Sequence, residues 1–92
     1  MAVEVRVPTL LRPQVGGAAT VSGDGTTVGE VFQSLIAQSP SLAESLIDGD
    51  GQLHKFVNVY RNDDDIRYLD GLDTKVSEGD VLSILPAVAG GA

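Results

Sequence analysis

Residues 81–91 read Val-Leu-Ser-Ile-Leu-Pro-Ala-Val-Ala-Gly-Gly, and this stretch carries most of the information about the fold. Its first five residues are almost all apolar, which is typical of a strand in the middle of a sheet or covered on both faces. Pro86 has no backbone N–H and therefore ends the pairing. Small residues and two adjacent glycines follow it. We expect a central last strand with a thin tail directly behind it.

The segments upstream predict the rest of a mixed sheet. Residues 3–7 alternate valine with charged residues, which predicts a half-buried strand. Residues 18–22 predict a weaker second strand, and residues 56–61, which are β-branched and aromatic, a third. Residues 62–65 have the composition of a turn, and residues 66–68 are expected to form a short return strand.

One main helix is predicted between the second and third strands. Thr27 is its expected N-cap, and Glu30 completes a capping box. Pro40 ends the helix, because the residue before a proline is pushed out of the helical region. Ser41 starts a second capping-box pattern, so residues 42–47 are expected to form one or two helical turns. The apolar residues of the main helix recur at helical spacing and form one stripe: Val28, Val31, Phe32, Leu35 and Ile36.

Two further segments are expected to lack regular structure. Pro8 and Pro13 bracket a predicted loop, and Gly23-Asp24-Gly25 predicts a turn.

One helix over a mixed sheet of four to five strands is an α+β architecture. With 92 residues the chain is long enough for one small domain. We expect residues 1–86 to form it, with residues 87–92 as a flexible tail.

Composition excludes several classes of function. The chain has no cysteine, which excludes disulfides, thiolate metal sites, iron–sulfur clusters and cysteine nucleophiles, and its single histidine excludes a multi-histidine metal site within one chain. The net charge of −7 repels phosphate backbones and argues against nucleic acid as a partner. The sequence shows no signal peptide and no apolar run of the roughly 20 residues that span a bilayer. We therefore expect a cytoplasmic protein that does not enter membranes.

Motifs that suggest chemistry in the body of the chain fail on inspection. Gly23-Asp24-Gly25 resembles the start of a dinucleotide fingerprint, but Val28 stands at the third glycine position. Asp63-Asp64-Asp65 does not continue as a calcium-binding loop, and a turn in which aspartate bonds its own backbone is the better interpretation. His54 is interpreted as a structural or surface residue. The acidic residues lie in turns and offer no acid–base pair, so we expect neither a metal site nor an enzyme.

The tail, Ala87-Val88-Ala89-Gly90-Gly91-Ala92, allows two interpretations. It is a frayed end, as termini of small residues often are, or it enters the active site of another protein. Two glycines have no side chain to obstruct a narrow channel. Five extended residues, 87 to 91, span at most ~17 Å, which is enough to reach a buried site while the domain docks outside.

Several stretches together resemble a known family. They are Phe-Val-Asn-Val-Tyr-Arg-Asn at residues 56–62, Gly71-Leu72, Glu78-Gly79-Asp80 and the closing residues 81–91. With them, essentially the whole chain resembles the ubiquitin-like sulfur carriers of the ThiS/MoaD family, which have the β-grasp fold. Residues 10–13, Leu-Leu-Arg-Pro, and the Ala-Val-Ala-Gly-Gly ending resemble the CysO-type carriers, a branch that serves cysteine synthesis.

The resemblance implies a carrier without catalytic side chains and without a bound cofactor. An E1-like enzyme would use ATP to adenylate the Gly91 carboxylate, and a sulfur donor would then leave a thiocarboxylate there. Gly90, which has no side chain, would precede the thiocarboxylate-bearing Gly91. Ala87, Val88 and Ala89 would thread the partner's active site. The implied partners are the E1-like enzyme, a sulfur-accepting biosynthetic enzyme (cysteine synthase-like or thiazole synthase-like) and a processing metalloprotease.

The sequence departs from the family pattern at Ala92, which leaves Gly91 with an amide where a free carboxylate is needed. We favour removal of Ala92 by a protease; otherwise the residue is not native, or this copy has lost the activity. Leu10, Leu11 and Pro86 are the candidate docking residues near the tail.

Rival functions remain open. The same carrier chemistry could serve molybdopterin, thiamin thiazole or a thiosugar or other secondary metabolite. A ubiquitin-like protein modifier would start with the same adenylation, whereas a plain β-grasp interaction domain would not need its tail.

Overall fold

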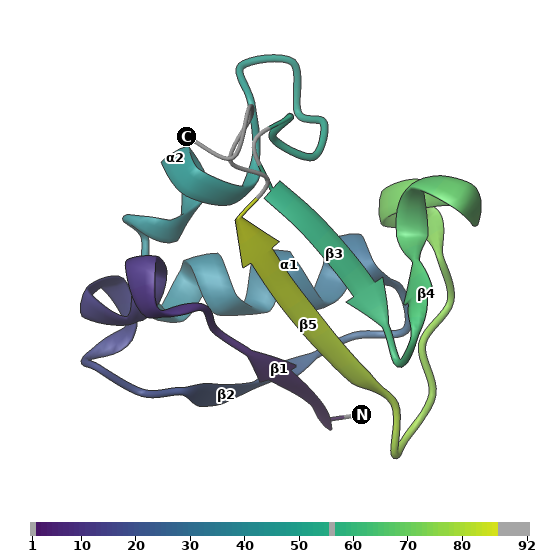
Figure 1. The fold of residues 1–92 in the computed structure, drawn as a ribbon, viewed down its shortest axis with the longest axis horizontal. Coiled ribbons are helices and arrows are strands. Elements are labelled where there is room, and N and C mark those ends of the chain that lie inside the picture. Colours follow the sequence, from purple (N-terminus) through teal and green to yellow (C-terminus); the bar gives the residue numbers. More distant parts are fainter. Residues whose placement is uncertain (1, 56, 87–92) are drawn as a thin grey trace.

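The computed structural model describes residues 2–55 and 57–86, and in them five strands form one mixed sheet in the order β2-β1-β5-β3-β4 (Figure 1). β1 and β5 run parallel, and the other neighbours are antiparallel. The strands are β1 (Ala2–Arg6), β2 (Thr20–Asp24), β3 (Val57–Arg61), β4 (Asp64–Asp65) and β5 (Val81–Pro86). The helices are α1 (Val28–Gln38) and α2 (Leu42–Leu46), with 3₁₀ helices η1 (Thr9–Val15), η2 (Ile66–Tyr68) and η3 (Gly71–Asp73).

The core lies between the sheet and α1, which crosses one face of the sheet (Figure 1). Strand residues alternate between the two faces, so Val3 and Val5 of β1 and Leu82 and Ile84 of β5 are buried in this core. Four residues of the predicted helical stripe are buried and Ile36 is partly buried. The prediction of a mixed sheet covered by one main helix is confirmed. No helix within residues 2–55 and 57–86 has the length and apolarity needed to cross a membrane.

The start of α1 follows the predicted capping pattern with one difference. The Thr27 side chain accepts a hydrogen bond from the Glu30 backbone N–H at 3.2 Å. The Glu30 carboxylate reaches one residue further back than a capping box requires, to the backbone N–H and hydroxyl of Thr26 at 2.8 and 2.9 Å. Backbone donors that the first turn leaves unpaired are thereby satisfied from the side chains.

The predicted loop between Pro8 and Pro13 is wrong, because residues from Thr9 to Val15 form η1. Pro8 is the N-cap of η1, where a proline is tolerated because the first backbone N–H groups of a helix have no partner, and Pro13 lies inside η1. Gly16, at φ +70°, ends η1, and the Gly17 N–H donates to the Arg12 carbonyl at 2.7 Å.

The second strand lies two residues later than residues 18–22, and it includes part of the Gly23-Asp24-Gly25 segment that predicted a turn. Gly23 pairs with Val3 inside β2. A Cβ at Gly23 would lie 2.8 Å from Val31 Cγ1 and 2.9 Å from the Val31 carbonyl oxygen. This glycine is therefore needed where α1 approaches the sheet.

The return strand is also corrected. β4 comprises Asp64–Asp65, whereas residues 66–68 form η2. Asn62 adopts φ +57°, so the chain reverses more tightly than the predicted turn over residues 62–65. The Asp65 carboxylate then caps η2 by accepting from the Arg67 backbone N–H at 2.9 Å.

The second capping box, at Ser41, is wrong. Ser41 has helical backbone angles and its side chain makes no cap hydrogen bond. The first donors of α2 are satisfied instead by backbone carbonyls: Leu42 N–H donates to Ser39 at 2.9 Å and Ala43 N–H to Pro40 at 3.1 Å. The short helix itself was predicted correctly.

Candidate functional site

The candidate site is the end of β5, because residues 87–91 follow directly from it. β5 is the middle strand of the sheet and is paired with β1 on one side and β3 on the other. Its last residue, Pro86, still lies opposite Val57 of β3. Leu85, on the face away from α1, is 46% exposed. The central position predicted for this strand is confirmed, and its outer face is partly open.

Arg67 fixes the partner strand at the same point. Its guanidinium donates from Nη2 to the Val57 carbonyl at 2.8 Å and to the His54 carbonyl at 3.3 Å. Nη1 donates to the Asn58 side-chain oxygen. The chain entering β3 is therefore tied to η2 beside the end of β5.

A groove of about 300 Å³ lies beside Pro86. It brings together the three candidate docking residues, Leu10 and Leu11 of η1 and Pro86 of β5. Leu10 is 69% exposed, and Leu11 is partly buried against the core. Sequence analysis missed the other lining residues, which come from the N-cap of η1, from α2, from the chain before β3, from β3 itself and from Ile84 of β5. The complete lining is Pro8, Leu10, Leu11, Glu44, Ser45, His54, Val57, Ile84 and Pro86.

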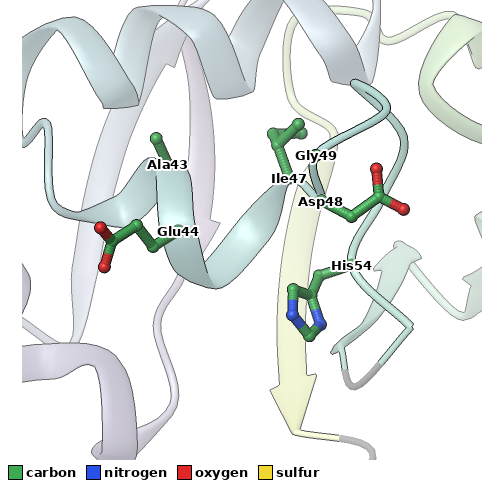
Figure 2. A pocket seen from close by; sticks show the side chains of 6 residues that line it. All are labelled: Ala43, Glu44, Ile47, Asp48, Gly49 and His54. Atoms are coloured by element: carbon green, nitrogen blue, oxygen red, sulfur yellow. The ribbon is translucent and has the colours of Figure 1, made fainter.

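A second hollow of about 520 Å³ is lined by residues of α2 and of the loop after it, and it shares Glu44 and His54 with the groove. Figure 2 shows the carboxylates of Glu44 and Asp48 pointing away from one another. Asp48 instead holds its own loop, because its Oδ1 accepts from the backbone N–H groups of Asp50 and Gln52 at 2.8 and 3.1 Å. His54 is half-buried, and its backbone N–H donates to the Leu46 carbonyl at 2.7 Å. The hydrogen bonds of Asp48 and His54 in this hollow are those of a structured loop.

Two carboxyl groups have shifted pKa values: Glu30 lies in the first turn of α1 and Asp80 in the turn before β5. Hydrogen bonds from Thr26 hold the pKa of Glu30 below its ordinary value of 4.5. Hydrogen bonds from Ser77 and Asn62 lower the pKa of Asp80 below 3.8. Glu30 opens α1, and Asp80 precedes β5 at the end opposite Pro86. Among the described residues, no group of three His, Asp or Glu side chains could hold a metal ion.

The predicted sulfur-carrying residues Gly90 and Gly91, the threading residues Ala87, Val88 and Ala89, and Ala92 all lie outside the described residues. The structure places the residue from which they start, Pro86, and the surface around it.

The chain is similar to known proteins over almost its whole length. It is 48% identical to the sulfur carrier protein CysO of Mycobacterium tuberculosis over 93 residues, covering 99% of this chain and 100% of the relative. It is 39% identical to small archaeal modifier protein 3 of Haloferax volcanii, with the same coverage of both chains.

Solved structures of related proteins show the same full-length similarity. The CysO crystal structure from M. tuberculosis superimposes with a TM-score of 0.88 at 46% identity, covering 94% of this chain and 99% of that one. A chain in the crystal structure of the Amycolatopsis orientalis BexX/CysO complex gives a TM-score of 0.89 at 42% identity, covering 96% and 98%. The β-grasp fold is thereby confirmed. The model of the ThiS family matches residues 5–91, and the chain therefore belongs to the ThiS family.

Proposed function

We propose that this chain is a sulfur carrier protein and that the carboxylate of Gly91 carries the sulfur. The observation that carries the proposal is the family match, which runs from residue 5 through the second glycine at residue 91. The full-length similarity to a sulfur carrier protein supports it. The sheet pairs the chain up to Pro86, so the four residues 87–90 separate the paired strand end from Gly91.

The chemistry follows from the terminal carboxylate. A C-terminal carboxyl has a pKa of about 3.3–3.7, so at neutral pH it is ionised and a poor electrophile. A carboxylate oxygen attacks the α-phosphorus of ATP on an E1-like enzyme, and pyrophosphate leaves. The sulfur of a donor then attacks the carbonyl carbon of this acyl-adenylate, and AMP leaves with one former carboxylate oxygen. The product is a Gly91 thiocarboxylate, whose sulfur is nucleophilic.

In this proposal the globular part contributes docking and reach, and the catalytic groups belong to the partners. Gly90 and Gly91 pass a narrow channel because they have no side chains. Leu10, Leu11 and Pro86 form an apolar surface beside the tail, of the kind that marks a partner site.

Cysteine biosynthesis is the pathway that we favour, with a cysteine synthase-like enzyme as the acceptor. The relative with 48% identity is named CysO, and a CysO chain occurs in complex with BexX. Molybdopterin, thiamin thiazole and thiosugar or other secondary-metabolite synthesis use the same tail chemistry in this proposal. A protease trims Ala92, a metalloprotease releases cysteine from the tail after sulfur transfer, and the carrier acts in the cytoplasm beside its ATP-dependent activating enzyme.

A second function, protein modification, is favoured by the 39% identity to small archaeal modifier protein 3. A modifier forms an isopeptide bond between Gly91 and a lysine of its target. The two functions differ in their products. A modifier gives high-mass conjugates in cell extracts, whereas a sulfur carrier gives a thiocarboxylate on the free chain.

Intact-protein mass spectrometry tests the proposal. Two chains, one ending at Gly91 and one at Ala92, are incubated with ATP, sulfide and the activating enzyme. We expect the chain that ends at Gly91 to gain the mass difference between sulfur and oxygen, and the chain that ends at Ala92 to stay unchanged. Failure of the chain ending at Gly91, beside an enzyme that loads another carrier, overturns the proposal.

A further inference from the structure

The end of η2 presents two large apolar side chains to water. Tyr68 is 88% exposed, and the residue after it, Leu69, is 40% exposed. Four large hydrophobic side chains are exposed in the described part of the chain, and only these two are neighbours in sequence. Single exposed apolar residues are ordinary, whereas contiguous exposed apolar surface marks a site of interaction. We call Tyr68 and Leu69 the η2 patch.

The η2 patch is anchored to the domain. η2 follows β4 at the edge of the sheet (Figure 1). Its first residue, Ile66, is fully buried in the core. Arg67 ties η2 to β3 by donating to the Val57 carbonyl, and Val57 lies opposite Pro86, where the tail starts. A contact surface that is already held in place loses little conformational freedom when a partner binds.

The surroundings of the η2 patch are acidic. Residues 62–73 contain five aspartates and one arginine, a formal charge of −4 out of −7 for the whole chain. Asp64 and Asp70, before and after η2, are exposed, and no ion pair within the described part of the chain neutralises them. The guanidinium of Arg67 is already bonded to carbonyl oxygens of its own chain. A partner that covers the patch therefore supplies the positive charge.

An arginine or lysine of a partner fits both parts of this surface. The face of an aromatic ring attracts a cation that lies within about 6 Å of the ring centre, and the aspartates attract the same charge. Tyrosine and arginine are also enriched at protein interfaces. The aspartates repel nucleic acids and anionic lipid surfaces, so the chemistry of the patch favours a basic protein surface.

The proposed function supplies a partner of this kind. An enzyme that adenylates Gly91 has to hold the phosphates of ATP, and proteins do so with arginine and lysine. The region where it receives the tail is therefore basic, and its field steers an acidic carrier towards it.

We propose that the η2 patch, with Asp64 and Asp70 beside it, docks the E1-like activating enzyme, and that an arginine or lysine of this enzyme stacks on the ring of Tyr68. Leu69 packs against apolar surface next to that cation. The inference rests on the proposed function and adds a charged, aromatic contact to the apolar surface of Leu10, Leu11 and Pro86.

Isothermal titration calorimetry tests the proposal. The chain that ends at Gly91 is titrated with the activating enzyme of the loading assay, without ATP and sulfide. We expect Tyr68→Ser to raise the dissociation constant about tenfold, the effect of losing one aromatic anchor. Tyr68→Phe keeps the ring and should bind like the native chain. Because Tyr68 is 88% exposed, both variants should keep the native urea midpoint.

Three outcomes of this titration overturn the proposal. Equal dissociation constants for the native and Tyr68→Ser chains show that the ring makes no contact. Equal weakening by Tyr68→Phe and Tyr68→Ser shows that the hydroxyl, and not the face of the ring, is recognised. A native chain that does not bind the enzyme has no such docking surface.

Two double variants of equal net charge test the role of the aspartates. We expect the first to weaken binding and to make it less sensitive to salt, because it removes charge beside the patch. The second removes charge from exposed residues of β2 and of the loop after α2, and should bind like the native chain. The first is Asp64→Asn, Asp70→Asn and the second is Asp24→Asn, Asp50→Asn. Equal weakening in both overturns the proposal, because binding then follows the net charge alone.

Sedimentation of the free native chain tests the other occupant, a second copy. We expect a monomer. A dimer that Tyr68→Ser dissociates overturns the proposal, because the patch is then covered by another carrier.

Sulfur loading distinguishes this inference from the proposed function. If the native chain is loaded while Tyr68→Ser binds the enzyme as tightly as the native chain, the docking role of the η2 patch alone is refuted. If binding depends on Tyr68 and the chain is never loaded, the carrier function is refuted and the docking surface stands.

Discussion

Val57 of β3 lies directly opposite Pro86 of β5, and its carbonyl accepts a hydrogen bond from Arg67 Nη2 at 2.8 Å. The end of the strand that carries the tail is therefore paired with a residue that η2 holds in place. Through Arg67, a short 3₁₀ helix some twenty residues before the tail contributes to the position from which the tail starts.

Arg67→Ala should loosen this end of the sheet. Arg67 donates to the carbonyls of Val57 and His54, and hydrogen bonds that involve a charged group contribute about 1.5–3 kcal/mol when buried. Because Arg67 is exposed, we expect a loss of about 1 kcal/mol in the free energy of unfolding by urea. We also expect faster amide hydrogen exchange at the start of β3.

Arg6→Ala is the matched control for Arg67→Ala. Arg6 forms a salt bridge with Glu4 at 3.4 Å, in which both side chains are largely exposed. Exposed pairs of this kind contribute little. If both arginine variants have the same stability and exchange pattern, the role assigned to Arg67 is wrong.

Gly23→Ala should destabilise the fold, although alanine is ordinarily well tolerated. The added Cβ would lie 2.8 Å from Val31 Cγ1 and 2.9 Å from the Val31 carbonyl oxygen, so α1 must move away from β2. Overpacking of this kind costs about 1–3 kcal/mol, measured as the free energy of unfolding. Gly49→Ala is the control, because no atom lies within 4 Å of a Cβ built there. A native-like Gly23→Ala chain would contradict the close approach.

Acid should weaken the fold through Glu30 and Asp80. Hydrogen bonds from Thr26 and from Ser77 and Asn62 lower the pKa values of these two carboxyls below 4.5 and 3.8 in the folded chain. A lowered pKa means that the folded state favours the ionised form. This stabilisation is complete above the pKa of the unfolded chain and is lost as the pH falls through the lowered folded value.

The measurement is urea unfolding at neutral pH and at several values below pH 4.5. We expect the native chain to lose stability over this range, and the double variant Glu30→Gln, Asp80→Asn to lose less. Equal losses in the two chains would show that these hydrogen bonds are not the source of the acid sensitivity.

The local parts of the fold could be predicted from the sequence, because their signals lie within a few residues. Thr27 and the apolar stripe that starts at Val28 specify α1, and the apolar run from Val81 specifies a central strand. The sequence around Gly23 predicts a turn, because glycine is common in turns. Its actual role depends on Val31, and no short-range pattern reports how closely a helix will approach a strand.

Some residues of the candidate site could likewise be predicted from the sequence, and others could not. The sequence predicts Leu10, Leu11 and Pro86 as apolar residues near the tail, and the structure places all three around one groove. The contribution of α2 to the groove and the contact of Arg67 with Val57 could not be predicted, since they depend on the packing of separate elements.

Gly91→Val tests whether the shape of the tail matters as much as its carboxylate. The native and Gly91→Val chains both end at residue 91, so the variant keeps a free terminal carboxylate of the same charge. It differs only in the side chain that it adds to the terminal residue. We expect a native circular dichroism spectrum and urea midpoint, because the change lies beyond β5, but no sulfur loading in the mass-spectrometric assay. Gly49→Val, in an open position of a surface loop, should load normally. If Gly91→Val is loaded as fast as the native chain, the argument from a narrow channel fails. The carboxylate alone would then be what the activating enzyme recognises, and the two glycines would need another explanation.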